Sequence, residues 1–262
     1  MGRRRSSRTS SRTWITTAVR SARSTSCRSG GTAKRLPAGL LETIAPSAVE
    51  PTAEDLFTYC YAVLVAPNYV GQFADELEIP GPRIPLTRDP ELFRRGIELG
   101  RKLIWLHTFG ERFVPASERA GRIPPSTAKA VKPVPQTTGE YPERHEYDEE
   151  TQTLHVGEGT FAPVSKAVRE FSVSGLDVVG SWLDYRMKVG AGRRSSELDK
   201  IRPTTWPAEF SEELLRVIWV IERTVALGPK LDSWLDEIVV GPLFLASELP
   251  EPTAAERKPP KA

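Results

Sequence analysis

Proline is the residue that most constrains how this chain can fold. The 262 residues include 23 prolines. Each proline fixes φ and removes a backbone donor, so it is costly inside a helix or a central strand. Prolines are concentrated at 80–85 and at 115–142, which holds six of them. We therefore predict an extended connector at 80–85 and a long surface loop at about 115–142, with the regular elements outside these two segments.

Charge is distributed unevenly along the chain. Residues 1–35 hold ten basic side chains, no acidic one and little apolar material. Subtracting these ten from the total of 36 leaves 26 basic against 34 acidic groups in the remaining residues, a net charge of −8. A segment such as 1–35 cannot offset the entropy lost on ordering, so we expect a disordered basic arm there and a disordered tail at 250–262. The arm could be a nucleic-acid-binding tail, a transit peptide or an accidental N-terminus.

Two helices are predicted near residues 52–79. Thr52-Ala-Glu-Asp55 has the composition of a capping box, and apolar residues recur after it at helical spacing until Pro67. Asn68 can cap a second helix that follows directly. Cys60 lies on the apolar face of the first helix, so we interpret it as a core residue and not as a nucleophile.

A longer helix is predicted from Pro90 to about Gly110. Asp89 and Pro90 have the residue types of an N-cap followed by proline at the first helical position. Gly96 and Gly100 lie four residues apart on its apolar side, which indicates that another element packs closely there. His107 falls near its C-terminus, where a cationic imidazole would interact favourably with the helix dipole.

Strands are predicted only after the long loop. Residues 146–148 and 153–156 flank a polar turn, which is typical of a hairpin, and a third strand is expected near 160–163. A further strand at 171–175 enters a tight turn at Gly175.

Helices are then expected from Leu176 to about Arg186, from Ser211 to about 227, and from about 231 to 240. The predicted fold class is α+β and predominantly helical, with helices packed with a small antiparallel sheet in one domain at 36–249.

The sequence carries no motif of a known catalytic chemistry. G-x-S-x-G, H-E-x-x-H, C-x-x-C, a glycine-rich dinucleotide fingerprint and the DPPY/NPPY-type tetrapeptide of amino-methyltransferases are all absent. His145 and His155 fall on the predicted hairpin, but no third metal ligand accompanies them. We therefore expect no catalytic residue, no metal and no cofactor. The chain has no apolar stretch of membrane-spanning length and no signal-peptide core, so a cytoplasmic location is expected.

Several short segments carry a resemblance through their order and spacing. They are 55–64 followed by Pro67-Asn-Tyr69, Pro82-Arg-Ile-Pro-Leu86, Leu99-Gly-Arg-Lys-Leu103 with Leu106-His107, Val173-Ser-Gly-Leu-Asp177, Ser181-Trp-Leu-Asp-Tyr-Arg186 and Arg202-Pro-Thr-Thr-Trp206. Together, over roughly 36–249, they resemble the C-terminal specificity domain of type ISP restriction–modification enzymes. In that family a nuclease, a helicase-like motor, an adenine methyltransferase and target-recognition parts follow one another in a single chain.

The resemblance implies a DNA target-recognition module that is not catalytic by itself. The nuclease, motor and methyltransferase motifs do not occur here, and the arm stands where an N-terminal section of the specificity domain is expected. The sequence therefore suggests an N-terminally truncated module or remnant. Its expected partners are double-stranded DNA and the methyltransferase or nuclease portion of a restriction–modification system. Two alternatives stay open: a module that binds separately encoded methyltransferase or nuclease subunits, and a non-functional gene fragment.

Cations on loops are the candidate DNA contacts, because Arg and Lys hold phosphates while base edges are read in the grooves. For each of them, a solvated surface cation is the simpler interpretation. The candidates are Arg83, Arg88, Arg186, Lys188, Arg193 and Arg194.

Overall fold

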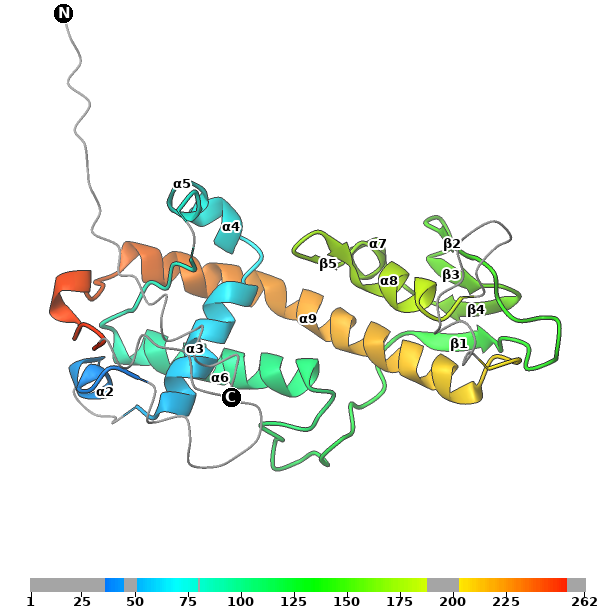
Figure 1. Ribbon diagram of the computed structural model, residues 1–262, viewed down its shortest axis with the longest axis horizontal. Coiled ribbons are helices and arrows are strands. Elements are labelled where there is room, and N and C mark those ends of the chain that lie inside the picture. Colours follow the sequence, from blue (N-terminus) through cyan, green and yellow to red (C-terminus); the bar gives the residue numbers. More distant parts are fainter. Residues whose placement is uncertain (1–35, 45–50, 80, 188–202, 254–262) are drawn as a thin grey trace, which may run out of the picture. The chain divides into compact units, whose positions relative to one another are not determined.

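The computed structural model describes residues 36–44, 51–79, 81–187 and 203–253 (Figure 1). The expected arm at 1–35 and most of the expected tail lie outside these residues. The chain divides into two compact units. We call Met1–Ile104 with Gly228–Ala262 the helical unit, and Trp105–Leu227 the mixed unit.

The helical unit contains short and long helices and, among its described residues, no strand longer than an isolated bridge. Its elements are α2 (Leu40–Ile44), α3 (Ala53–Val65), α4 (Tyr69–Gln72), α5 (Ala74–Leu77), α6 (Pro90–His107) up to Ile104, α9 (Ala208–Val240) from Gly228, and the 3-10 helix η3 (Ala246–Glu248). The predicted helices at 53–65 and from Pro90 are confirmed.

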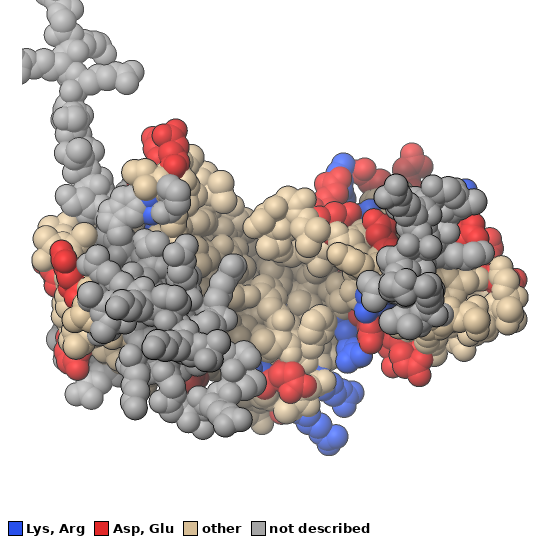
Figure 2. Space-filling model, viewed as in Figure 1, with Lys and Arg blue, Asp and Glu red and all other residues tan. Residues whose placement is uncertain are grey.

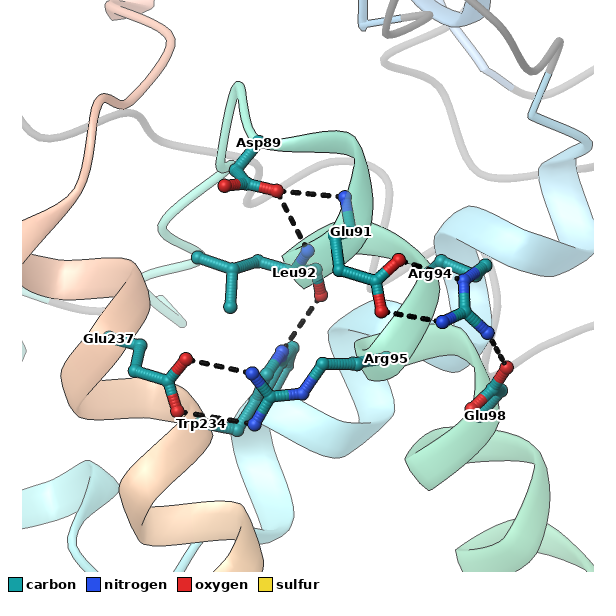
Figure 3. Close-up of polar contacts among 8 residues, drawn as sticks. All are labelled: Asp89, Glu91, Leu92, Arg94, Arg95, Glu98, Trp234 and Glu237. Carbon is teal, nitrogen blue, oxygen red and sulfur yellow. Dashed lines mark hydrogen bonds and ion pairs between the residues drawn. The ribbon is translucent and has the colours of Figure 1, made fainter.

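The predicted starts of α3 and α6 are confirmed by their hydrogen bonds. The backbone N–H of Asp55 donates to the Thr52 hydroxyl, and that of Thr52 donates to the Asp55 carboxylate, each at 3.1 Å. At α6 the Asp89 carboxylate accepts from the N–H groups of Glu91, at 2.8 Å, and Leu92, at 3.1 Å (Figure 3). In both cases side chains satisfy donors that the first helical turn leaves free.

Asn68 behaves differently from the sequence-based expectation. It is the N-cap residue of α4, but its side chain makes no capping bond. The amide instead donates to Asp236 of α9 at 3.0 Å, and the Asn68 backbone N–H donates to Asp232 at 2.8 Å. The acidic partners lie more than 160 residues away, so the local pattern could not reveal them.

The two glycines of α6 allow close packing, as predicted. A Cβ at Gly100 would overlap the backbone carbonyl of Thr58, and one at Gly96 would lie 2.7 Å from the Tyr59 ring and overlap Trp234. Tyr59 meets Trp234 edge to face, with ring centroids 5.4 Å apart. The Trp234 indole N–H donates to the carbonyl of Leu92 at 2.8 Å (Figure 3). This aromatic cluster is part of the buried core of the helical unit and requires glycine at position 96, while the backbone of Thr58 requires glycine at position 100.

The mixed unit is built on a four-stranded antiparallel sheet in the order β1-β4-β3-β2 (Figure 1). Its strands are β1 (Lys129–Lys132), β2 (His145–Asp148), β3 (Thr153–Val156) and β4 (Gly159–Ala162). A second, two-stranded ribbon pairs β5 (Ser172–Val173) with β6 (Leu176–Asp177). The unit also holds α7 (Lys166–Arg169), α8 (Val178–Asp184) and α9 up to Leu227.

The predicted hairpin and third strand are confirmed as β2, β3 and β4. The expected loop at 115–142 is corrected, because it contains β1, which pairs with β4. All four β1 side chains are exposed, so no apolar alternation marks the strand in the sequence. A smaller correction concerns Leu176, which lies in β6, so that the following helix begins at Val178.

Helix α9 corrects the prediction of two separate helices at 211–227 and 231–240. It is one helix of 33 residues that contains Pro229. An interior proline costs about 3 kcal/mol or more. Burial on both sides of the proline offsets this, because Leu227, Leu231 and Trp234 are all almost inaccessible. The α+β, mainly helical class with a small antiparallel sheet is confirmed.

His107, the last residue of α6, is mostly buried. Its Nε2 lies 2.9 Å from the hydroxyl of Thr224 on α9, within the mixed unit. Burial lowers the pKa of the His107 imidazole below its ordinary value of 6.5. The imidazole is therefore neutral at pH 7, and the expected interaction of a cationic imidazole with the helix dipole does not operate there.

Replacing Gly100 tests the close packing of α6. We expect Gly100→Ala to lower the free energy of unfolding by about 1–3 kcal/mol or more, because the new methyl group meets backbone that cannot rotate away. Gly71→Ala is the matched control, since a Cβ there meets no atom within 4 Å. Urea unfolding of both variants measures the effect. Equal stability of the two variants would show that α6 does not pack as described.

The buried His107 predicts a specific dependence of stability on pH. Its folded-state pKa is lowered, so its contribution is complete above the unfolded-state pKa of about 6.5 and is lost as pH falls from there through the lowered folded-state pKa. His107→Gln, which keeps a polar side chain but cannot be protonated there, should lose less stability over that range than the wild type. Urea midpoints at several pH values measure this. Parallel pH profiles for the two proteins would contradict it.

Candidate nucleic-acid interface

Three of the six cations proposed from the sequence lie within the described residues. They are Arg83, Arg88 and Arg186, whereas Lys188, Arg193 and Arg194 lie outside the described residues. The environment of each described cation decides how much of its charge is available to a ligand.

Arg83 is almost fully buried, with 1% of its surface exposed. Its guanidinium donates to the carbonyls of Gly81, at 2.9 Å, and Ile79, at 3.0 Å. Its backbone N–H donates to the hydroxyl of Tyr69 at 2.7 Å. These contacts hold the proline-rich connector in an extended path. They favour a structural role for Arg83 over the expected DNA contact, because its donor groups already serve the connector.

Arg88 is compensated by an acid and an aromatic ring. Its side chain, 41% exposed, forms an ion pair with Glu248 and lies over the ring of Phe244, 4.3 Å from the centroid. Its Nε also donates to the carbonyl of Leu243 at 3.2 Å. Arg88 therefore joins the segment before α6 to the segment after α9.

Arg186 is held in the same manner within the mixed unit. Its guanidinium lies over the Trp182 ring, 3.8 Å from the centroid, and its Nη2 is 3.0 Å from the Glu213 carboxylate. The Tyr141 hydroxyl donates to its carbonyl at 2.8 Å. Each of the three described candidates thus has internal partners.

Charge within the mixed unit is segregated along the chain. Residues 105–134 carry five basic and two acidic side chains, a net charge of +3. The other described residues of the unit, 135–187 and 203–227, carry six basic and fourteen acidic side chains, a net charge of −8. We call residues 105–134 the basic segment. Figure 2 shows blue side chains gathered at the lower edge of that view, where the chain runs between α6 and β1 in Figure 1.

A closed loop forms the first part of the basic segment. The N–H of Gly121 donates to the carbonyl of Gly110 at 3.0 Å, which joins the two ends of residues 110–121. Both glycines have positive φ, at 86° for Gly110 and 69° for Gly121. A Cβ at Gly110 would lie 2.8 Å from the backbone of Arg122, so only glycine permits this crossing. The loop is therefore a compact unit whose ends meet.

Helix α9 fixes the second part of the basic segment. The Glu222 carboxylate accepts from the backbone N–H of Thr127 at 3.2 Å, from that of Ala128 at 3.3 Å, and from the Thr127 hydroxyl. The Trp219 indole donates to the Ala128 carbonyl at 2.8 Å, and Arg223 donates to the Pro125 carbonyl at 3.0 Å. These contacts set the position at which β1 begins.

Four cations of the basic segment are exposed and form no ion pair with any described residue. They are Arg112, Arg119, Arg122 and Lys129. The sequence analysis missed three of them because they lie in the predicted loop at 115–142, and it missed Arg112 because charge was summed over all residues after 35. A local charge count over residues 105–134 would have found them.

The opposite charge gathers around the β2–β3 turn, where Asp148, Glu149 and Glu150 follow one another. Cations in this region are paired, as Lys166 is with Glu149 at 2.9 Å. His145 pairs with Val156 across the sheet and His155 with Glu146, so the two histidines lie on opposite faces. His145 instead lies 3.1 Å from the Asp184 carboxylate. Among the described residues, no helix is long and apolar enough to span a membrane.

Comparison with solved structures finds chains of which a part has a similar fold. DrdV in complex with DNA aligns with a TM-score of 0.50 and 24% identity over 69% of this chain and 18% of that one. A nuclease-deletion mutant of the type ISP enzyme LlaGI, in complex with a DNA substrate mimic, aligns with a TM-score of 0.47 and 20% identity over 69% of this chain and 14% of that one. The ATP-dependent type ISP enzyme LlaBIII bound to DNA aligns with a TM-score of 0.49 and 17% identity over 71% of this chain and 11% of that one. The aligned part is less than a fifth of each of these chains.

The family comparison is more decisive. No curated protein matches the chain. The family model of the type ISP C-terminal specificity domain matches residues 14–217. This range begins inside the expected arm and not at residue 36, and it ends inside α9 and not at residue 249. A match over more than half of the chain shows the family. The chain belongs to the type ISP C-terminal specificity domains.

Proposed function

We propose that this chain recognises a DNA target sequence for a restriction–modification system in the cytoplasm and that it is not catalytic by itself. The match to the specificity-domain family over residues 14–217 carries this proposal. The similar chains LlaGI, DrdV and LlaBIII were all solved with DNA or a DNA mimic. The methyltransferase and nuclease portions of such a system would be its protein partners.

The charge distribution supports a DNA ligand. Recognition of DNA combines cations that hold phosphates with side chains that read base edges. The basic segment offers exposed and uncompensated cations, while the rest of the mixed unit is acidic. A duplex would therefore be attracted to one part of this unit and repelled by the remainder.

Selection from a pool of randomised DNA duplexes tests sequence recognition. We expect the full chain to enrich one short motif. Single base-pair changes in that motif should weaken binding by about 1–3 kcal/mol each, as is typical of specific protein–DNA complexes. A pool that shows no enrichment, with equal affinity for all duplexes, would contradict target recognition.

That negative result would favour the second candidate, a module that binds the catalytic subunits through protein contacts. The observation that favours it is the acidic surface around the β2–β3 turn, which repels phosphate. Co-purification of this chain with a separately expressed methyltransferase portion, in the absence of DNA, would then distinguish the two.

Catalysis is the other point to test. We expect no transfer of a labelled methyl group to DNA and no cleavage of DNA by the purified chain, because its sequence lacks the motifs for either reaction. A complete enzyme of the family serves as the positive control. Methyl transfer above the level of a blank, retained through repeated purification, would overturn the non-catalytic assignment.

A further inference from the structure

We infer that Arg112, Arg119, Arg122 and Lys129 contact the phosphate backbone of the DNA, and that they determine which side of the mixed unit meets the duplex. The inference deepens the proposed function and rests on it. It assigns phosphate contacts to residues that differ from the cations first proposed from the sequence.

Positive charge is available at these four residues. A cation that already has a carboxylate partner gains less from a phosphate, because binding must first break the internal pair. Arg88 and Arg186 have such partners in Glu248 and Glu213. The four cations of the basic segment are exposed and have no ion-pair partner among the described residues. They can each exchange water and counterions for a phosphate directly.

The backbone that carries three of the four cations is fixed before binding. Arg112 and Arg119 lie in the loop that Gly110 and Gly121 close, and Arg122 follows directly after it. A loop whose ends are joined before binding loses less conformational entropy when it meets a ligand. Long side chains on a fixed loop can follow the phosphates while the backbone keeps its position.

The fourth cation, Lys129, is connected to the four-stranded sheet. Glu222 and Trp219 of α9 hold Thr127 and Ala128, directly before Lys129. Lys129 begins β1, which is an edge strand of the four-stranded sheet. Helix α9 therefore sets the position of Lys129 through its hydrogen bonds to Thr127 and Ala128.

The other described residues of the mixed unit would repel a DNA duplex. The other described residues of the mixed unit have a net charge of −8, and the β2–β3 turn contributes three consecutive acids. Like charges at close range oppose docking of a duplex there. Attraction at the basic segment and repulsion by the rest of the described mixed unit both favour docking of the duplex on the basic segment.

The dependence of binding on salt tests this assignment in the full chain. The test variant combines Arg112→Gln, Arg119→Gln and Arg122→Gln. The matched control combines Arg94→Gln, Arg144→Gln and Lys166→Gln, which removes the same charge from exposed cations that each have an acidic partner. Both variants keep the basic arm at 1–35, so any binding by that arm cancels in the comparison.

Binding is titrated at several salt concentrations on two probes, the duplex enriched by selection and a mixed-sequence duplex. The slope of log K against log salt falls by about 0.9 for each lost phosphate contact, so the test variant should lose about 3 in slope and the control much less. The preference for the selected duplex should stay the same, because phosphate contacts carry no base information. Adding Lys129→Gln should lower the slope again by about 0.9. Urea midpoints confirm that the variants are folded.

Two outcomes would overturn the inference. One is a test variant whose slope equals that of the control. The other is a lost preference for the selected duplex at an unchanged slope, which would make these residues base contacts. A wild-type chain with no sequence preference would instead contradict the proposed function. In that case the slope on the mixed-sequence duplex would still show whether these cations contact phosphates.

Discussion

The hydrogen bonds between α9 and residues 125–128 are the interactions on which the architecture of the mixed unit most depends. Glu222 accepts from two backbone N–H groups and a hydroxyl, and Trp219 and Arg223 donate to two carbonyls. A segment rich in proline cannot supply its own regular hydrogen bonds, so its backbone groups need partners elsewhere. By satisfying them, α9 sets where β1 begins. The path of the basic segment follows from this attachment, and β1 then pairs with β4 at one edge of the sheet.

Local compensation of charge is more informative here than net charge. The sequence has a net charge of +2, which says little about a DNA ligand. Within the mixed unit, however, cations such as Lys166 and Arg186 have acidic partners, whereas four exposed cations of the basic segment have none among the described residues. Arg186 has an aromatic and an acidic partner, and such a residue contributes to packing as much as to charge. Attraction of DNA therefore depends on which cations are neutralised inside the protein and not on how many there are.

Features encoded by neighbouring residues were predictable from the sequence. The capping box at Thr52, the start of α6 at Asp89 and the β2–β3 hairpin each depend on residues within a few positions of one another. The close approach at Gly96 and Gly100 was also predictable, because glycine weakens a helix interior and is retained there mainly where a neighbouring element leaves no room for a Cβ.

The errors came from contacts between residues that are distant in the sequence. Strand β1 exists through its pairing with β4, about 30 residues later. Helix α9 continues through Pro229 because of tertiary burial. The partners of Arg88 and Arg186 lie 160 and 27 residues away, so the sequence showed cations but not their neutralisation. The cations Arg119, Arg122 and Lys129 were overlooked because the predicted surface loop at 115–142 carries them, and Arg112 because charge was not counted locally.

The basic segment, all of it described, offers four exposed cations without an ion-pair partner, and this number limits how much it would contribute to recognition. Four phosphate contacts correspond to a salt slope of about 3.6, whereas proteins with 6–10 such contacts bind far more tightly at low salt. Most of the affinity for DNA would then come from outside the basic segment, either from other parts of this chain or from the rest of an enzyme. A recognition unit with modest backbone affinity has an advantage, since binding to wrong sequences is mainly backbone binding. The acidic remainder of the mixed unit lowers that non-specific affinity further and leaves discrimination to the contacts with base edges.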